Sequence, residues 1–182
     1  MSNLVLIDET SVSTPANSIS ITNVFSADYD TYCIQIVGTS AESSAANNFM
    51  DMRLINSSDS IITSTVYEWE YYYARGFSAT FLNIGGTSRD EYTRLYHDDD
   101  ALKGFSNMTM WIFNPFQSDS YTFHIQQSAG YGRDAASASI PIMHKGIGVL
   151  KQESSITGYN WINRDSINIA NGTFRTYGLK VN

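Results

Sequence analysis

The stretch Ser18-Ile19-Ser20-Ile21-Thr22 alternates polar and apolar residues without a break. Successive side chains of a β-strand point to opposite faces, so this pattern is typical of a strand that buries one face. The same period of two recurs at residues 32–37, 49–55 and 121–126. The sequence therefore predicts a protein built from antiparallel β-strands.

In the stretch 121–126, the apolar residues Tyr121, Phe123 and Ile125 occupy alternate positions. His124 lies between two of them, so we expect it to point outward, away from the core. Residues 107–113 differ because they carry apolar side chains at both parities. That segment is expected to be buried on both faces or to lie at a subunit contact.

One segment allows two interpretations. Residues Thr65 to Glu68 match a helix capping box, and residues 65–75 could form about three helical turns. However, aromatic residues share one parity from Tyr67 to Tyr73, and aromatic residues favour strands. We expect a strand here, with a short helix as the alternative.

The last pair of expected strands covers residues 166–169 and 173–181, with Asn171-Gly172 between them as a hairpin turn. Clusters of turn-forming residues separate the other strands at intervals that suit a β-sandwich. The fold class is thus all-β, a single-domain, jelly-roll-like antiparallel β-sandwich over residues 18–182. Residues 1–17 form an N-terminal arm or a first strand.

Composition excludes several classes of protein. The chain has 182 residues, of which 42% are hydrophobic and 16% charged, and this is neither disordered nor coiled-coil composition. A net charge of −7 disfavours nucleic-acid binding. No stretch approaches the length of a membrane helix, so we expect neither membrane insertion nor targeting. Cys33 is the only cysteine, which excludes an internal disulfide and indicates assembly in a reducing compartment.

The densest group of metal-ligating residue types is His97-Asp98-Asp99-Asp100. Hard cations such as Ca²⁺ prefer several carboxylate oxygens from one loop, so this group is the candidate metal site. The alternative is a solvated acidic turn, because the spacing of an EF-hand loop is absent. We expect no cofactor.

Catalytic patterns are weak. The histidines His97, His124 and His144 lack the sequence context of a catalytic triad or a zinc motif. Paired carboxylates for glycoside cleavage could come from Glu68, Glu70 or Asp51, but sequence alone does not pair them. We therefore expect no enzymatic activity.

Aromatic residues make up 13% of the chain, and we expect more large apolar side chains than one core of this size absorbs. Symmetric oligomers bury such a surplus, so we expect self-association, with a homotrimer as the favoured state. The residues expected at the subunit or capsid contact are Tyr67, Trp69, Tyr71, Tyr73, Trp111 and Phe116.

Three segments carry a resemblance to a known family. Residues 23–32 read N-V-F-S-A-D-Y-D-T-Y, residues 112–115 read I-F-N-P, and residues 172–180 read G-T-F-R-T-Y-G-L-K. In order and spacing they resemble a family of small tailed-phage virion proteins found in marine and cyanobacterial phages.

That resemblance implies a structural component of a virion, either a capsid decoration (cement) protein or a fibre or tail accessory. Its partners would be copies of itself and other virion proteins, with assembly in the host cytoplasm. A receptor-binding module that grips host polysaccharide is the alternative function. A polysaccharide-cleaving enzyme is a third, less favoured one.

Overall fold

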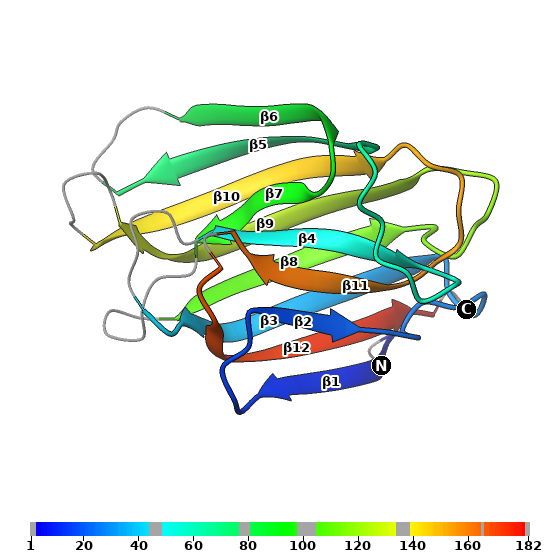
Figure 1. The fold of residues 1–182 in the computed structure, drawn as a ribbon, viewed down its shortest axis with the longest axis horizontal. Helices are drawn as coiled ribbons and strands as arrows, with labels where there is room; N and C mark the ends of the chain where they lie inside the picture. The colour runs from blue at the N-terminus through cyan, green and yellow to red at the C-terminus, as the bar shows by residue number, and fades with distance from the viewer. Residues whose placement is uncertain are drawn as a thin grey trace.

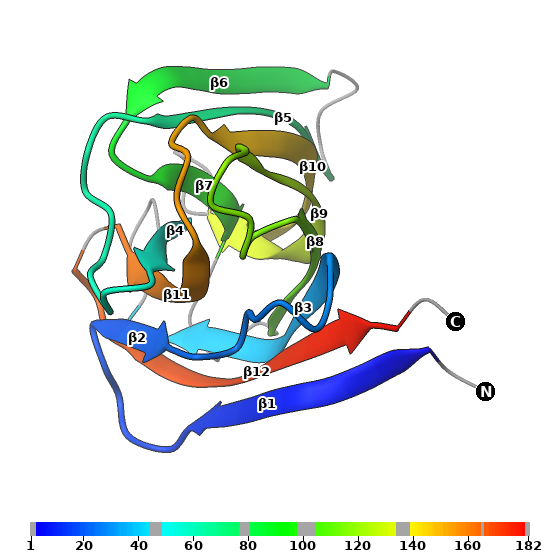
Figure 2. The same ribbon diagram turned by 90° about the vertical axis from the view of Figure 1, so that its right-hand side faces the viewer.

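The alternating segments form β-strands that pack as two facing antiparallel sheets. The computed structural model describes residues 3–43, 49–76, 81–97, 105–133, 139–164 and 166–180. Figure 2 shows the larger sheet curving around the smaller one, so that the larger sheet has a convex outer face. Within those ranges no helix is long and apolar enough to cross a membrane.

The larger sheet has eight strands, and the smaller sheet has four (Figure 1). The eight strands lie in the order β1 (Leu4–Val12), β12 (Ile169–Leu179), β3 (Thr31–Ala41), β8 (Ser106–Phe113), β9 (Thr122–Arg133), β10 (Ser139–Leu150), β5 (Tyr67–Arg75) and β6 (Leu82–Arg89). The four strands lie in the order β2 (Ser18–Ile21), β11 (Ile156–Asn163), β4 (Phe49–Asn56) and β7 (Tyr92–His97). The N-terminal segment thus supplies an edge strand, β1.

The hydrophobic core lies between the two sheets. The smaller sheet contributes Met50 and Met52 of β4, and the larger one contributes Ile34 of β3 and Met110 of β8, all fully buried. Each of these residues belongs to the apolar parity of its strand, as a half-buried strand requires. The predicted all-β antiparallel sandwich is confirmed, while the jelly-roll pattern of connections stays a prediction.

The segment with two interpretations is a strand. β5 runs from Tyr67 to Arg75 and pairs with both β10 and β6. Burial alternates along it, since Tyr67 and Tyr71 are buried and Tyr72 is exposed. The helix alternative is therefore wrong, because a helix would spread the aromatic side chains around its axis instead of burying them on one face.

The predicted C-terminal hairpin is also wrong. β12 continues through Asn171 and Gly172, and the register with β3 shifts on both sides of Asn171. Asn171 donates a side-chain hydrogen bond to the hydroxyl of Ser40 at 2.9 Å. The Asn-Gly pair thus forms β-bulges inside one long strand, where tertiary pairing outweighs the local turn preference.

The corner around residues 26–32 is held by hydrogen bonds and ring packing. The hydroxyl of Tyr32 donates to the carbonyl of Ser26 and accepts from its N–H, both at 2.8 Å. The ring of Tyr29 lies against Gly178 of β12, where a Cβ atom would come within 2.5 Å of ring carbons. The corner therefore ties the start of β3 to the end of the chain, in the manner of tyrosine corners in other sandwiches.

Candidate functional site

Strand β9 directs its polar residues toward the core and its apolar residues toward the surface, the reverse of what its sequence predicts. Its polar residues Thr122, His124, Gln126 and Ser128 are buried between the sheets. Its apolar residues Phe123 and Ile125 face outward and are 53% and 45% exposed. The prediction that His124 points outward is therefore wrong. The strand period was correct, but the assignment of its two faces was reversed.

The buried His124 lies in an aromatic environment. Its ring is 4.4 Å from that of Tyr92, edge to face, and 6.5 Å from that of Tyr71. Gly148 of β10 makes room for it, because a Cβ atom there would overlap the imidazole. Among the described residues, neither ring nitrogen has a hydrogen-bond partner. Burial lowers the pKa of His124 to about 3, so the imidazole is neutral at pH 7.

A continuous apolar surface covers part of the outer face of the larger sheet, on β8, β9 and β10. In the pairing register, Ile147 of β10 lies beside Ile125 of β9, and Ile125 lies beside Trp111 of β8. A second row continues from Val149 through Phe123 to Phe113. Here the apolar band means Phe113, Trp111, Phe123, Ile125, Ile147 and Val149. A surface of this kind is typical of a protein contact site.

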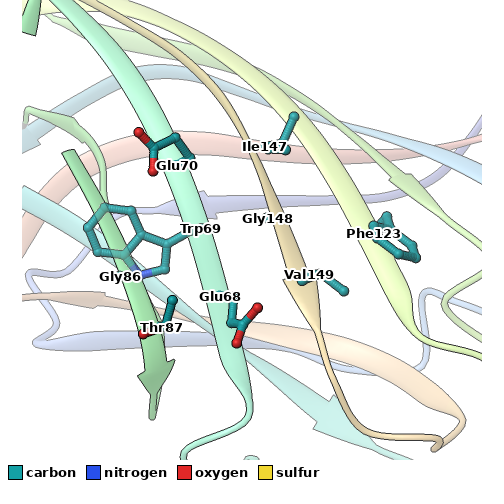
Figure 3. Close-up of a pocket in the computed structure, with 9 residues that line it drawn as sticks. All are labelled: Glu68, Trp69, Glu70, Gly86, Thr87, Phe123, Ile147, Gly148 and Val149. Atoms are coloured by element: carbon teal, nitrogen blue, oxygen red, sulfur yellow. The ribbon is translucent and has the colours of Figure 1, made fainter. Parts of the chain in front are cut away.

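Two pockets border the apolar band. The first has a volume of about 250 Å³ and is shown in Figure 3. There Glu68 and Glu70 lie on either side of Trp69 along β5. The carboxylate of Glu68 points toward Val149, and that of Glu70 points toward Gly85 of β6. The second pocket, of about 470 Å³, lies between Tyr72, Trp111 and Lys145. The apolar band is thus bordered by two pockets, and Glu68, Glu70 and Lys145 place charges of both signs beside it.

Four of the six predicted contact residues lie in the interior. Tyr67, Trp69, Tyr71 and Tyr73 face the opposite sheet and are at most 9% exposed. The Trp69 and Tyr71 rings stack at 4.9 Å. The hydroxyl of Tyr67 accepts a hydrogen bond from the N–H of Leu54 in β4 and donates one to the carbonyl of Ile62 in the loop after β4. The expectation that these side chains make a subunit contact is wrong, because the sandwich itself covers them.

The other two predicted contact residues lie nearer the surface. Trp111 is half-buried in the apolar band, and Phe116 is half-buried in the loop that follows β8. The sequence did not reveal that Phe123, Ile125 and Ile147 are exposed on the outer face of the larger sheet. A strand with one polar and one apolar parity does not show which parity faces the core, so no local signal could have identified them.

The candidate metal site cannot be assembled from the structure. His97 is the last residue of β7, and Asp98, Asp99 and Asp100 lie outside the described residues. Within the part of the chain that is described, no three histidine, cysteine or acidic side chains gather as a metal site.

The three candidate catalytic acids are divided between the two sheets. Asp51 of β4 is buried and accepts two hydrogen bonds from Arg164, each at 3.0 Å, and one from the backbone N–H of Arg94 at 2.7 Å. Burial raises the pKa of Asp51, and Arg164 opposes that rise. Glu68 forms an ion pair with Lys151 at 3.1 Å. These contacts give Asp51 and Glu68 structural roles.

Comparison with known proteins adds no family assignment. The sequence matches no protein-family model, and no curated protein matches it significantly. The likeness to the phage virion family therefore stays a resemblance carried by three short segments.

Proposed function

We propose that this chain is a structural protein of a virus particle, and that the apolar band binds a second copy of the chain. The observation that carries the proposal is the inversion of β9. This strand buries an imidazole and an amide while Phe123 and Ile125 remain at the surface. Such an arrangement is costly for a solitary domain and favourable once another molecule covers the apolar side.

The dimensions of the face support a contact between copies. Strands are spaced about 4.8 Å apart and rise about 3.3 Å per residue, so the apolar band, which covers about four residues on each of three strands, projects about 200 Å². A stable interface covers about 800 Å² per partner, so the contact would extend from the apolar band onto the neighbouring outer faces of β3 and β5. Burying a fully exposed large apolar side chain contributes about 1.5–3 kcal/mol, and covering one that is already half-buried contributes roughly half as much. Several together can offset the loss of rotational and translational freedom.

The charges beside the apolar band suit a contact between the same faces of two copies of the chain. Glu70 lies next to Ile147 in the register, and Lys145 lies two residues before Ile147 on the same face. A two-fold arrangement would bring an acidic margin toward a basic one. The homotrimer expected from the sequence stays a prediction, since three copies need ring-closing contacts between different patches.

The test is a substitution in the centre of the apolar band. Ile147 is 59% exposed, so Ile147→Lys leaves the core intact and places a charge where the second copy would dock. Sedimentation equilibrium is expected to show that the parent chain self-associates and that this variant is monomeric. Ile61→Lys is the matched control, because Ile61 is 39% exposed and pairs with Ile55 on the smaller sheet. A parent chain that is monomeric at all concentrations would refute the contact.

The virion assignment is tested on purified phage particles. Quantitative mass spectrometry is expected to find this chain in them. Hundreds of copies per particle would indicate capsid decoration, and about six to eighteen would indicate a tail or vertex appendage. Particles that lack the chain would exclude the assignment.

A host polysaccharide receptor is the second candidate function. The observation in its favour is the pocket of about 470 Å³ where the ring of Tyr72 is 52% exposed beside Lys145. Exposed aromatic rings can stack on sugar rings. A glycan array would show binding that Tyr72→Ala removes. Trp69 is buried and offers no such platform. Enzymatic activity is not part of the proposal, so digests of host polysaccharide are expected to release no reducing ends.

A further inference from the structure

A polar pocket opens where the edge strands of the two sheets meet, next to the turn that joins β6 to β7. Figure 1 shows these two strands following one another at the same side of the sandwich. The pocket has a volume of about 390 Å³. We call it the arginine pocket, after the residues that line it, among them Arg89, Arg94, Arg164, Asp90, Glu91 and Trp69. It does not overlap the apolar band.

The acidic residues around the arginine pocket already have cationic partners. Asp90 and Glu91 form ion pairs with Arg53 at 2.9 and 3.1 Å. Asp51, which lies next to the pocket, is bound by Arg164 through two hydrogen bonds. Arg53 balances only one of its two carboxylates, and Arg164 balances Asp51. Four arginines (Arg53, Arg89, Arg94 and Arg164) thus stand against three carboxylates (Asp51, Asp90 and Glu91), and the group keeps one net positive charge.

Arg89 and Arg94 have no ion-pair partner among the residues that the structure describes. The guanidinium of Arg94 lies 5.0 Å from the ring centre of Phe49, and that of Arg164 lies 5.3 Å from the same ring. Two positive charges thus share one aromatic side chain. Burial and the charge of Arg164 lower the pKa of Arg94, as expected for a cation near a like charge.

The backbone at Arg94 also departs from ordinary strand geometry. Arg94 has a φ of 58°, in the left-handed region that non-glycine residues rarely adopt. This conformation directs its N–H to the carboxylate of Asp51 at 2.7 Å. Backbone strain of this kind is concentrated at binding and catalytic sites. The indole N–H of Trp69, another lining residue, is buried and has no acceptor among the described groups.

We propose that the arginine pocket binds a small ligand that carries a carboxylate group, held by the guanidinium groups of Arg89 and Arg94. A guanidinium presents a planar fork of N–H donors that matches a carboxylate in two parallel hydrogen bonds. A negative charge in the pocket would also relieve the repulsion between Arg94 and Arg164. Room for a ligand of monosaccharide size follows from the volume of the pocket.

The probe for this proposal is sodium glucuronate, and glucose is the uncharged control of similar size. Isothermal titration calorimetry of the full chain at constant ionic strength is expected to show binding of glucuronate and none of glucose. Arg89→Gln and Arg94→Gln should each weaken binding about tenfold, since each removes a charge-assisted pair of hydrogen bonds. Arg175→Gln is the matched control and should bind like the parent, because Arg175 is paired with Glu9 on the outer face.

Three outcomes would overturn the proposal. They are the absence of glucuronate binding, binding that both glutamine variants retain in full, and tighter binding of inorganic sulfate than of glucuronate. Arg94→Lys keeps the positive charge and removes the planar fork, so it tests Arg94 if the glutamine variant fails to fold. The readout is independent of self-association, because Ile147→Lys should bind glucuronate as the parent chain does.

Discussion

The two buried histidines should make the fold sensitive to mild acid. His124 and His144 are 2% and 1% exposed. Burial lowers their pKa values to about 3 and about 4, and for His144 the nearby charges of Arg94 and Arg75 act in the same direction. An unfolded chain would titrate both at about 6.5. Because the folded-state pKa is the lower one, protons bind preferentially to the unfolded chain, and stability falls as pH drops below about 6.5.

The magnitude follows from these pKa values. Between pH 7 and pH 5 each histidine of the unfolded chain goes from about one quarter protonated to almost fully protonated, and the folded form takes up almost no proton. Each histidine therefore costs about 2 kcal/mol of unfolding free energy over that interval, and the pair costs about 4 kcal/mol. This is a large share of the about 5–15 kcal/mol that keeps a typical domain folded.

Urea unfolding at pH 7, 6 and 5, followed by tryptophan fluorescence at one protein concentration, measures the effect. His124→Asn and His144→Asn remove one titrating ring each, so each variant should reduce the loss of unfolding free energy between pH 7 and pH 5 by about 2 kcal/mol. Asp51, whose pKa burial raises, acts in the opposite direction and is unchanged in both variants. The quantity compared is the slope of unfolding free energy against pH. A loss of packing lowers that free energy at every pH and leaves the slope unchanged. If both variants keep the full slope of the parent chain, the histidines are not the origin of acid sensitivity and the argument from their burial fails.

Three further changes test the fold. Gly178→Ala should cost about 1–3 kcal/mol in urea unfolding, because a Cβ atom there would overlap the ring of Tyr29; an unchanged midpoint would contradict the corner packing. Tyr32→Phe should cost about 1–2 kcal/mol, since it removes the hydroxyl that bonds twice to Ser26. Burial raises the pKa of Cys33 to about 11, so an aromatic disulfide reagent should label it at pH 7 only after denaturant is added. Rapid labelling of the native chain would show that the thiol is accessible.

The sequence was sufficient to predict the strands and the class of fold. Met50, Met52 and Leu54 alternate with polar residues, and all three are in the core. The alternation along β4 depends on local chemistry, which a single sequence records. Asn114, which precedes Pro115 after β8, shows the limit: a residue before proline favours extended geometry, but Asn114 adopts a φ of 50° and donates its N–H to the distant carbonyl of Asp30.

The features that the sequence did not reveal depend on contacts between distant segments. Asn171-Gly172 has the composition of a hairpin turn, but pairing with β3 keeps it inside one strand. His124 has an apolar residue on each side, and its burial depends on the space left by Gly148 of a neighbouring strand. Likewise, the arginine pocket joins Arg89 and Arg164, which lie far apart in the sequence.

The position of β12 has a consequence for how the protein is made. This strand lies between β1 and β3, and it hydrogen-bonds to both. β3 can pair earlier with its other neighbour, β8, but β12 is the strand beside β1 at this edge of the sheet. The nascent chain must therefore hold β1 unpaired until residues 169–179 have left the ribosome, and its docking closes one of the longest loops the chain can form.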